Sequence, residues 1–290
     1  MAGTAASGRR SRFAPYGLLS PGVIWLALFF LVPVAFLFRT SLSEKSGRFD
    51  LNPDFNWHWS NYTDSLSDFT DQFIRGFGYA AVATILALLI GYPLAYVIAF
   101  RGGRWKNLLL GLVVVPLFAT FLVRTFAWKT IVADEGLLVG VLRDVGILGA
   151  SGRLDATPIA VIGGLTYNFL PFMVLPIYVA LERLDFSLID AAKDLYSSAS
   201  RAFFKIVLPL SLPGVFAGSL LTFIPASGDY VNAELLGGPN TTMTGNVVYN
   251  QFIGQNNYPT AAAISIMLMV VITIAVLVYS KVLGTEDLVG

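Results

Sequence analysis

The stretch DAAKDLYSSASRAFFKIVLPLSLPG, from Asp190 to Gly214, is polar and carries both signs of charge within an otherwise apolar chain. Its apolar residues recur at the i, i+3, i+4 and i+7 spacing of a helix, which predicts two short amphipathic helices. The first set is Leu188, Ala191, Ala192 and Leu195, and the second is Ala199, Ala202, Phe203 and Ile206. Pro209 and Pro213 are expected to end this unit, because proline disrupts a helix interior.

The pattern alone leaves two interpretations of this stretch open. The amphipathic pair packs on its own membrane domain or lies among lipid headgroups. Alternatively, it docks on a separate cytoplasmic protein, in the way that an amphipathic helix lies in a groove.

The composition of the whole chain indicates a membrane protein. Of its 290 residues, 56% are hydrophobic and 13% are charged, whereas soluble domains carry about 25% charged residues. A net charge of +1 argues against a nucleic-acid-binding protein. The absence of cysteine excludes disulfides and zinc–thiolate sites, and the single histidine, His58, has no evident partner, so no metal site is predicted.

Apolar stretches long enough to cross a bilayer predict an all-α polytopic fold with six transmembrane helices, since each crossing needs about 20 residues. They are residues 18–42, 73–100, 107–132, 158–181, 212–231 and 260–283. The first exceeds the length of a signal-peptide core and is expected to be retained. Gly214 and Gly218 form a G-x-x-x-G that predicts close helix packing, within the chain or against a partner permease.

Lysine and arginine residues predict the orientation. They concentrate in the N-terminus, the second and fourth loops and the tail, which favours a cytoplasmic location for these segments and both termini. The expected organisation is a cytoplasmic segment 1–17, a permease domain 18–283 and a tail 284–290. A cytoplasmic loop of about residues 183–210 lies between the fourth and fifth helices.

This loop resembles the coupling loop of ABC-importer permease subunits of the binding-protein-dependent transport family. The family pattern is Glu-Ala-Ala, three residues, Gly, nine residues and Ile-x-Leu-Pro. Here the same spacing gives Asp190-Ala191-Ala192, then Tyr196, then Ile206-Val207-Leu208-Pro209. Aspartate replaces glutamate, and Tyr196 replaces glycine, which costs about 1–2 kcal/mol if that position is left-handed. The resemblance implies a coupling hairpin that contacts an ATPase through Asp190, Ala191, Ala192, Leu195, Tyr196, Phe203, Ile206, Leu208 and Pro209.

Further stretches look like spermidine/putrescine permease subunits, among them VPLFATFLVRTFAWKTIVADEGLL from Val115 and TYNFLPFMVLPIYVALERLD from Thr166. The resemblance implies a non-enzymatic transport subunit in a bacterial inner membrane. Its expected partners are a homologous permease, two ABC ATPases and an extracytoplasmic substrate-binding protein. The chain contains no G-x-x-x-x-G-K-[ST], so we expect it to bind no cofactor and its partner ATPases to use ATP and magnesium.

Polar and aromatic residues near the ends of the spans are the candidate substrate pathway. Asp229 follows Pro225 and Gly228, and a carboxylate beside a broken helix suits a cation. Aromatic faces also attract ammonium groups. The candidates are Asp229, Tyr167, Asn168, Trp128, Tyr230 and Glu234, with Glu234 as part of an outer gate.

Several of these residues suit a purely structural role equally well. Asp229 is expected near the outer interface, where a carboxylate costs little, and Trp128 equally suits an interface anchor. Arg124 and Lys129 are expected to be structural or to reach the interface, because they would repel a polyamine. Alternative functions are an ABC permease for another small solute, an ion-coupled secondary transporter, and a scaffold that tolerates loss of Asp229 and Tyr167.

Overall fold

The structure is a computed structural model that describes residues 14–45, 47, 53–149, 152–184 and 198–282. Apart from one short antiparallel pair, β1 (Ser43–Glu44) and β2 (Asp54–Phe55), the described residues form helices and their connections. Among the described residues, five helices are long and apolar enough to cross a membrane, and counting one sharply bent pair as a single span brings the number to six. The predicted all-α, polytopic fold is therefore confirmed.

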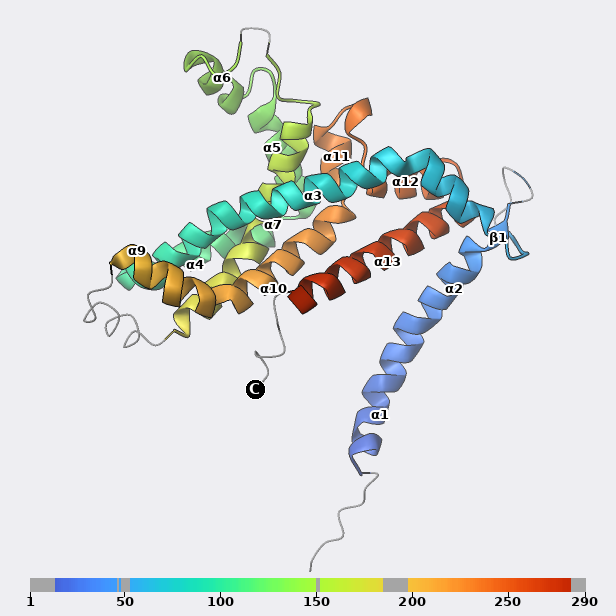
Figure 1. The fold of residues 1–290 in the computed structure, drawn as a ribbon. Coiled ribbons are helices and arrows are strands. Elements are labelled where there is room, and N and C mark those ends of the chain that lie inside the picture. The colour runs from blue at the N-terminus through green and yellow to red at the C-terminus, as the bar shows by residue number, and fades with distance from the viewer. Residues whose placement is uncertain (1–13, 46, 48–52, 150–151, 185–197, 283–290) are drawn as a thin grey trace, which may run out of the picture.

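Three long helices form the centre of the bundle: α3 (Ser60–Arg101), α7 (Pro158–Glu182) and α10 (Leu208–Ser227) (Figure 1). Small residues recur every three or four positions along α3 and are buried. A Cβ added to Gly91 would lie 3.2 Å from Cγ of Met173 in α7. Such small residues let two helix backbones approach closely. The small residues on α3 are Gly76, Ala80, Ala83, Ala87, Gly91 and Ala95.

The G-x-x-x-G of α10 packs inside this chain. A Cβ on Gly214 would lie 2.6 Å from Cβ of Ala180, and one on Gly218 would lie 2.9 Å from the carbonyl oxygen of Met173. Both contacts are on α7. The two glycines therefore fix the α7–α10 contact and are not available to a partner permease.

The N-terminal span stands apart from this centre. It consists of α1 (Ala14–Leu26), the π-helical turn η1 (Ala27–Leu31) and α2 (Val32–Ser41). Figure 1 shows α1 leading away from the bundle, whereas the far end of α2 approaches α13 (Tyr258–Val282). None of the most apolar window within Leu19–Ser41 is buried inside the chain, so these side chains face its surroundings.

The third predicted span is not one straight helix. The segments Gly103–Phe118 and Phe121–Asp144 meet at a bend of 102°. They comprise η2 (Gly103–Trp105), α4 (Lys106–Val114), η3 (Val115–Phe118), α5 (Phe121–Val132) and α6 (Leu137–Asp144). Pro116 lies in η3, Ala119 is extended, and the Thr120 hydroxyl accepts a hydrogen bond from the Val123 amide at 3.4 Å, which begins a new helix. The predicted range 107–132 crosses this bend.

The prediction that Pro209 and Pro213 end the helical unit is wrong. The chain continues from α9 (Ala199–Ala202) through the π-helical turn η4 (Phe203–Val207) into α10. Pro209 directly follows the π-helical turn η4, within this continuous helical segment. Pro213 lies inside α10, as membrane helices tolerate. The fifth candidate span is consequently Ser200–Ser227 and not 212–231.

Short helices cover one end of the bundle. They are α11 (Val231–Leu236), η5 (Pro239–Thr241), α12 (Thr244–Tyr249) and the π-helical turn η6 (Asn250–Gly254). In Figure 1, α11 and α12 lie at the opposite end of the bundle from α4 and α9. Three of the predicted pathway residues, Asp229, Tyr230 and Glu234, therefore lie in or next to α11 at one end, whereas α9 lies at the other end.

Candidate functional site

Asp229 lies between α10 and α11, two residues beyond the end of the fifth candidate span. The residue is 8% exposed, and its Oδ1 accepts a hydrogen bond from the backbone amide of Asn232 at 2.7 Å. Burial raises the pKa of Asp229 to about 6, against the opposing effect of its hydrogen bonds from Asn232. Asp229 was expected near the outer interface, where a carboxylate costs little. In the structure it is buried, and it caps the start of α11.

Asn168 is fully buried in the middle of α7 and joins three helices. Its Nδ2 donates to Oγ1 of Thr125 in α5 and to Oδ1 of Asn232 in α11, both at 3.0 Å. Asn232 in turn binds Asp229 through its backbone. We name Thr125, Asn168, Asn232 and Asp229 the polar hub. Thr125 and Asn232 were not predicted, although polar residues between apolar neighbours are a usable signal.

Arg124 belongs to the surroundings of this hub. It is 8% exposed and its Nη1 donates to the carbonyl oxygen of Asn168 at 3.0 Å. Among the described residues, no carboxylate forms an ion pair with it. Of its two predicted placements the structure favours the structural one, because the guanidinium points into the bundle and not to the membrane surface.

Trp128 and Tyr167 form a stacked pair beside the hub. Their ring centroids are 5.7 Å apart and their planes differ by 12°. Trp128 Nε1 donates to the carbonyl oxygen of Ala160 at 3.2 Å, and a Cβ on Gly163 would lie 2.8 Å from the indole. Tyr167 remains 37% exposed. A glycine on α7 thus admits the indole, and the pair presents an aromatic surface at the edge of the bundle.

Tyr230 and Glu234 lie in a second group. The Tyr230 ring stacks on Tyr249 at 5.0 Å and 9°. Asn246 Nδ2 donates both to Oε2 of Glu234 at 3.0 Å and to the carbonyl oxygen of Tyr230 at 3.1 Å. The structure therefore separates the six predicted pathway residues into the polar hub with its aromatic pair, and a group around Asn246.

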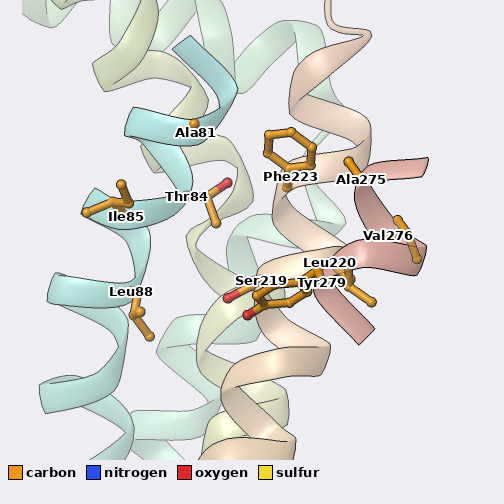
Figure 2. Close-up of a pocket in the computed structure, with 10 residues that line it drawn as sticks. All are labelled: Ala81, Thr84, Ile85, Leu88, Ser219, Leu220, Phe223, Ala275, Val276 and Tyr279. Atoms are coloured by element: carbon orange, nitrogen blue, oxygen red, sulfur yellow. The ribbon is translucent and has the colours of Figure 1, made fainter. Parts of the chain in front are cut away.

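An apolar cavity of about 380 Å³ lies between α3, α10 and α13 and contains none of these residues (Figure 2). Thr84, Ser219 and Tyr279 supply its few polar atoms, and Figure 2 shows Phe223 and Leu88 among its walls. Thr84 already donates to the carbonyl oxygen of Ala80 at 2.7 Å. Because an unpaired charge is costly in such surroundings, this cavity does not suit a charged solute.

The predicted coupling residues are only partly visible. Asp190, Ala191, Ala192, Leu195 and Tyr196 lie outside the described residues. Within η4, Phe203 packs edge-on against Tyr92 and Tyr96 of α3, with centroids 5.8 and 5.7 Å apart. Its neighbour Phe204 is 64% exposed. Phe203 therefore contacts the chain's own membrane domain.

The remaining coupling candidates follow Phe203 along the same segment. Ile206 and Leu208 are half-buried and Pro209 is exposed. Nearby, Tyr92 shares a hydrogen bond of 2.8 Å with Ser211 of α10, which fastens α10 to α3 at this end. At the same end, Lys106 Nζ pairs with Glu182 at 2.5 Å, joining the start of α4 to the end of α7.

Solved structures with similar folds include ABC transporters. One, a bacterial ABC transporter involved in the import of the acidic polysaccharide alginate, aligns with a TM-score of 0.66 at 17% identity and covers 93% of this chain and 94% of its own. An inward-facing MetNI methionine ABC transporter aligns with a TM-score of 0.58 at 16% identity, covering 74% and 94%. At these identities the likeness shows the fold alone.

Sequence relatives are much closer. The spermidine/putrescine transport system permease protein PotB of Haemophilus influenzae is 37% identical over 262 residues, which is 89% of this chain and 90% of the relative. The protein of the same name from Escherichia coli K12 is 35% identical over 256 residues, or 88% and 92%. Residues 87–282 match the family described as binding-protein-dependent transport system inner membrane component. The chain belongs to that family.

Proposed function

We propose that this chain is the permease subunit of an ATP-driven importer of polyamines such as spermidine and putrescine. The observation that carries the proposal is its identity of 35–37% with spermidine/putrescine permeases over about 90% of their length. At this coverage the similarity extends through the spans as well as the coupling loop.

The site chemistry supports a cationic solute. A polyamine carries separated ammonium groups on an apolar chain, and such groups suit carboxylates flanked by aromatic faces. The stacked Trp128–Tyr167 pair and the exposed Tyr230 and Glu234 provide these surfaces toward the same end of the bundle. In this proposal Asp229 acts mainly by holding α11, which carries Asn232 and Glu234.

Energy enters from other chains in this proposal. The sequence lacks a phosphate-binding loop, so ATP and magnesium belong to two partner ATPases, and this chain is not itself an enzyme. ATP-driven closure of the ATPases pulls together the 190–209 segments of this chain and of its partner permease. This movement opens the transport pathway between the two permeases to the outside. A homologous permease completes the membrane part, and a binding protein delivers the solute. Both termini lie in the cytoplasm, because the basic loops are on that side.

Uptake in proteoliposomes tests the proposal. The chain is reconstituted with its permease partner, ATPases and binding protein, and labelled spermidine is supplied with ATP. We expect ATP-dependent uptake that unlabelled putrescine inhibits and that an ATPase variant lacking its phosphate-binding lysine abolishes. Uptake driven by an ion gradient without ATP would instead establish a secondary transporter, and uptake of another solute but no polyamine would refute the substrate.

A further inference from the structure

The pocket beneath Glu234 combines hydrogen-bond acceptors with irregular backbone. It encloses about 500 Å³, within the range of small-molecule sites, and lies between α3, α11, α12 and η6. Among the described residues that line it there is no lysine or arginine, and Glu234 is the one charged side chain. Its chemistry therefore favours a positively charged ligand.

Two amide oxygens in this pocket wall lack donors. Gln251 is 8% exposed, and its Oε1 is buried without a hydrogen bond from any described residue. Oε1 of Gln72, on α3 in the same pocket wall, is also buried without a hydrogen bond from any described residue. A buried acceptor without a donor is destabilising. The terminal amide torsion of glutamine is soft and roughly two-fold, so its rotation exchanges the positions of the oxygen and the nitrogen.

The backbone around the pocket departs from regular helix at two places. Phe69 interrupts α3 with φ −121° and ψ 17°, and η6 is a π-helical turn. Both line the pocket. π-helical turns are frequent at functional sites.

A lysine outside the pocket lining already binds one carbonyl oxygen of the pocket wall. Lys45 Nζ donates to the carbonyl oxygen of Gln255, a residue of the pocket wall, at 2.9 Å. On the same wall the ring of Tyr249 is 46% exposed and stacks on Tyr230. A carboxylate, amide and carbonyl oxygens, and an aromatic face are the groups that hold an alkylammonium ion.

We propose that this pocket binds one terminal aminoalkyl group of a diamine or polyamine at the end of the bundle opposite to the coupling segment. The Glu234 carboxylate takes the ammonium charge, and Gln72 and Gln251 accept its remaining N–H bonds. The inference rests on the proposed function for the identity of the amine, whereas the recognition of an alkylammonium group rests on the pocket alone.

Equilibrium binding of labelled putrescine to the assembled transporter in nanodiscs, without binding protein and without ATP, tests this inference. We expect Glu234→Gln to weaken binding about tenfold or more, and Gln251→Glu to tighten it severalfold by adding a second carboxylate. The neutral analogue 1,4-butanediol should not compete. Glu135→Gln, which neutralises an exposed carboxylate outside the pocket, is the matched control and should bind as the unaltered protein does.

Wild-type affinity in Glu234→Gln, or effective competition by the diol, would overturn the inference. Thermal unfolding of each variant verifies its fold, and the gain expected for Gln251→Glu cannot arise from misfolding. If diamine binds in this way but proteoliposomes take up no polyamine, the proposed function fails and the pocket stands. If uptake proceeds and Glu234→Gln binds normally, the pocket fails alone.

Discussion

Asp229 places an ionisable group in a buried position where its neutral form is favoured. Since burial raises its pKa from 3.8 to about 6, the folded chain holds the proton more tightly than the unfolded chain does. The stabilising contribution of protonation is complete below about pH 4 and is lost as pH rises through 6. At pH 7 the ionised side chain costs on the order of 3 kcal/mol.

Asp229→Asn should therefore change how stability depends on pH. Asparagine retains an oxygen that caps α11 but does not ionise. We expect the variant to melt higher than the unaltered protein at pH 7, on the order of 5 °C, with the difference disappearing toward pH 4. Melting temperatures in detergent from pH 4 to 8 measure this, with the exposed Asp71→Asn as control. Parallel curves for Asp229→Asn and the unaltered protein would contradict it.

Asn168 and Asn232 act as one unit in the polar hub. Removing either takes one hydrogen bond from the other, which stays buried, and each loss should cost about 1–3 kcal/mol. In a double-mutant cycle, Asn168→Ala and Asn232→Ala should show a coupling of about 1 kcal/mol. The free energies of unfolding of the unaltered protein, the two single variants and the double variant give this value. Additive losses would show that the hydrogen bond between them contributes nothing.

The hub also shows where sequence reasoning about single residues stops. Asp229, Asn168 and Trp128 could be selected because polar and aromatic groups in apolar spans are costly or specialised. Their partners come from α5, α7 and α11, and the packing of three helices decides which side chains meet. Arg124 illustrates this, because only the structure reveals the carbonyl oxygen of Asn168 as its acceptor.

Among the helical segments, η4 joins α9, in the predicted coupling loop, to α10 in the centre of the bundle. Its Phe203 ring fits between Tyr92 and Tyr96, and Tyr92 is hydrogen-bonded to Ser211. A movement of the loop should therefore reach α3 through these rings. The pattern of apolar residues predicted that Phe203 lies on a buried face but did not identify which surface buries it.

Phe203→Ala should weaken the connection between ATP hydrolysis and uptake. Two aromatic contacts, each about 0.5–1.5 kcal/mol, are lost, so we expect uptake per ATP to fall roughly tenfold while the ATPases still co-purify. Phe203→Leu, which keeps much of the volume, should restore part of the uptake. Leu210→Ala, at an exposed position 46% open, is the control. Normal uptake per ATP in Phe203→Ala would exclude this route of transmission.

The contact between α7 and α10 depends on the absence of a side chain at Gly214. Because a Cβ there would lie 2.6 Å from both Cβ of Ala180 and the carbonyl oxygen of Pro176, Gly214→Ala should lower the melting temperature markedly. Gly111→Ala in α4 is the matched control, since a Cβ at Gly111 meets nothing within 4 Å. This control should be neutral or stabilising by up to about 1 kcal/mol, as alanine favours helix. Equal effects of the two changes would mean that α10 moves aside.

For the molecule as a whole, hydropathy was sufficient to locate the helices and insufficient to show their breaks. The fourth predicted span, 158–181, nearly coincides with Pro158–Glu182 because Thr157 caps its start and the apolar run ends with it. The third span contains a bend of 102°, since an apolar run has the same average whether it is straight or bent. The prolines also led to a wrong start for the fifth span, because the helix continues from η4 through Pro209 into α10.

The orientation of the chain is a prediction that its composition makes simple to test. The sequence contains no cysteine, so a single introduced thiol can be labelled without background. Ser67, near the start of α3, and Ser200, in α9, are both exposed. The start of α3 and α9 lie at opposite ends of the bundle (Figure 1). The excess of basic residues in the loop that contains Ser200 assigns it to the cytoplasm. In intact cells, a membrane-impermeant maleimide should therefore label Ser67→Cys and should reach Ser200→Cys only after permeabilisation. Labelling of both variants in permeabilised cells verifies that each thiol is accessible. The opposite pattern in intact cells would invert the orientation. The predicted coupling loop would then lie on the side of the membrane away from any ATPase.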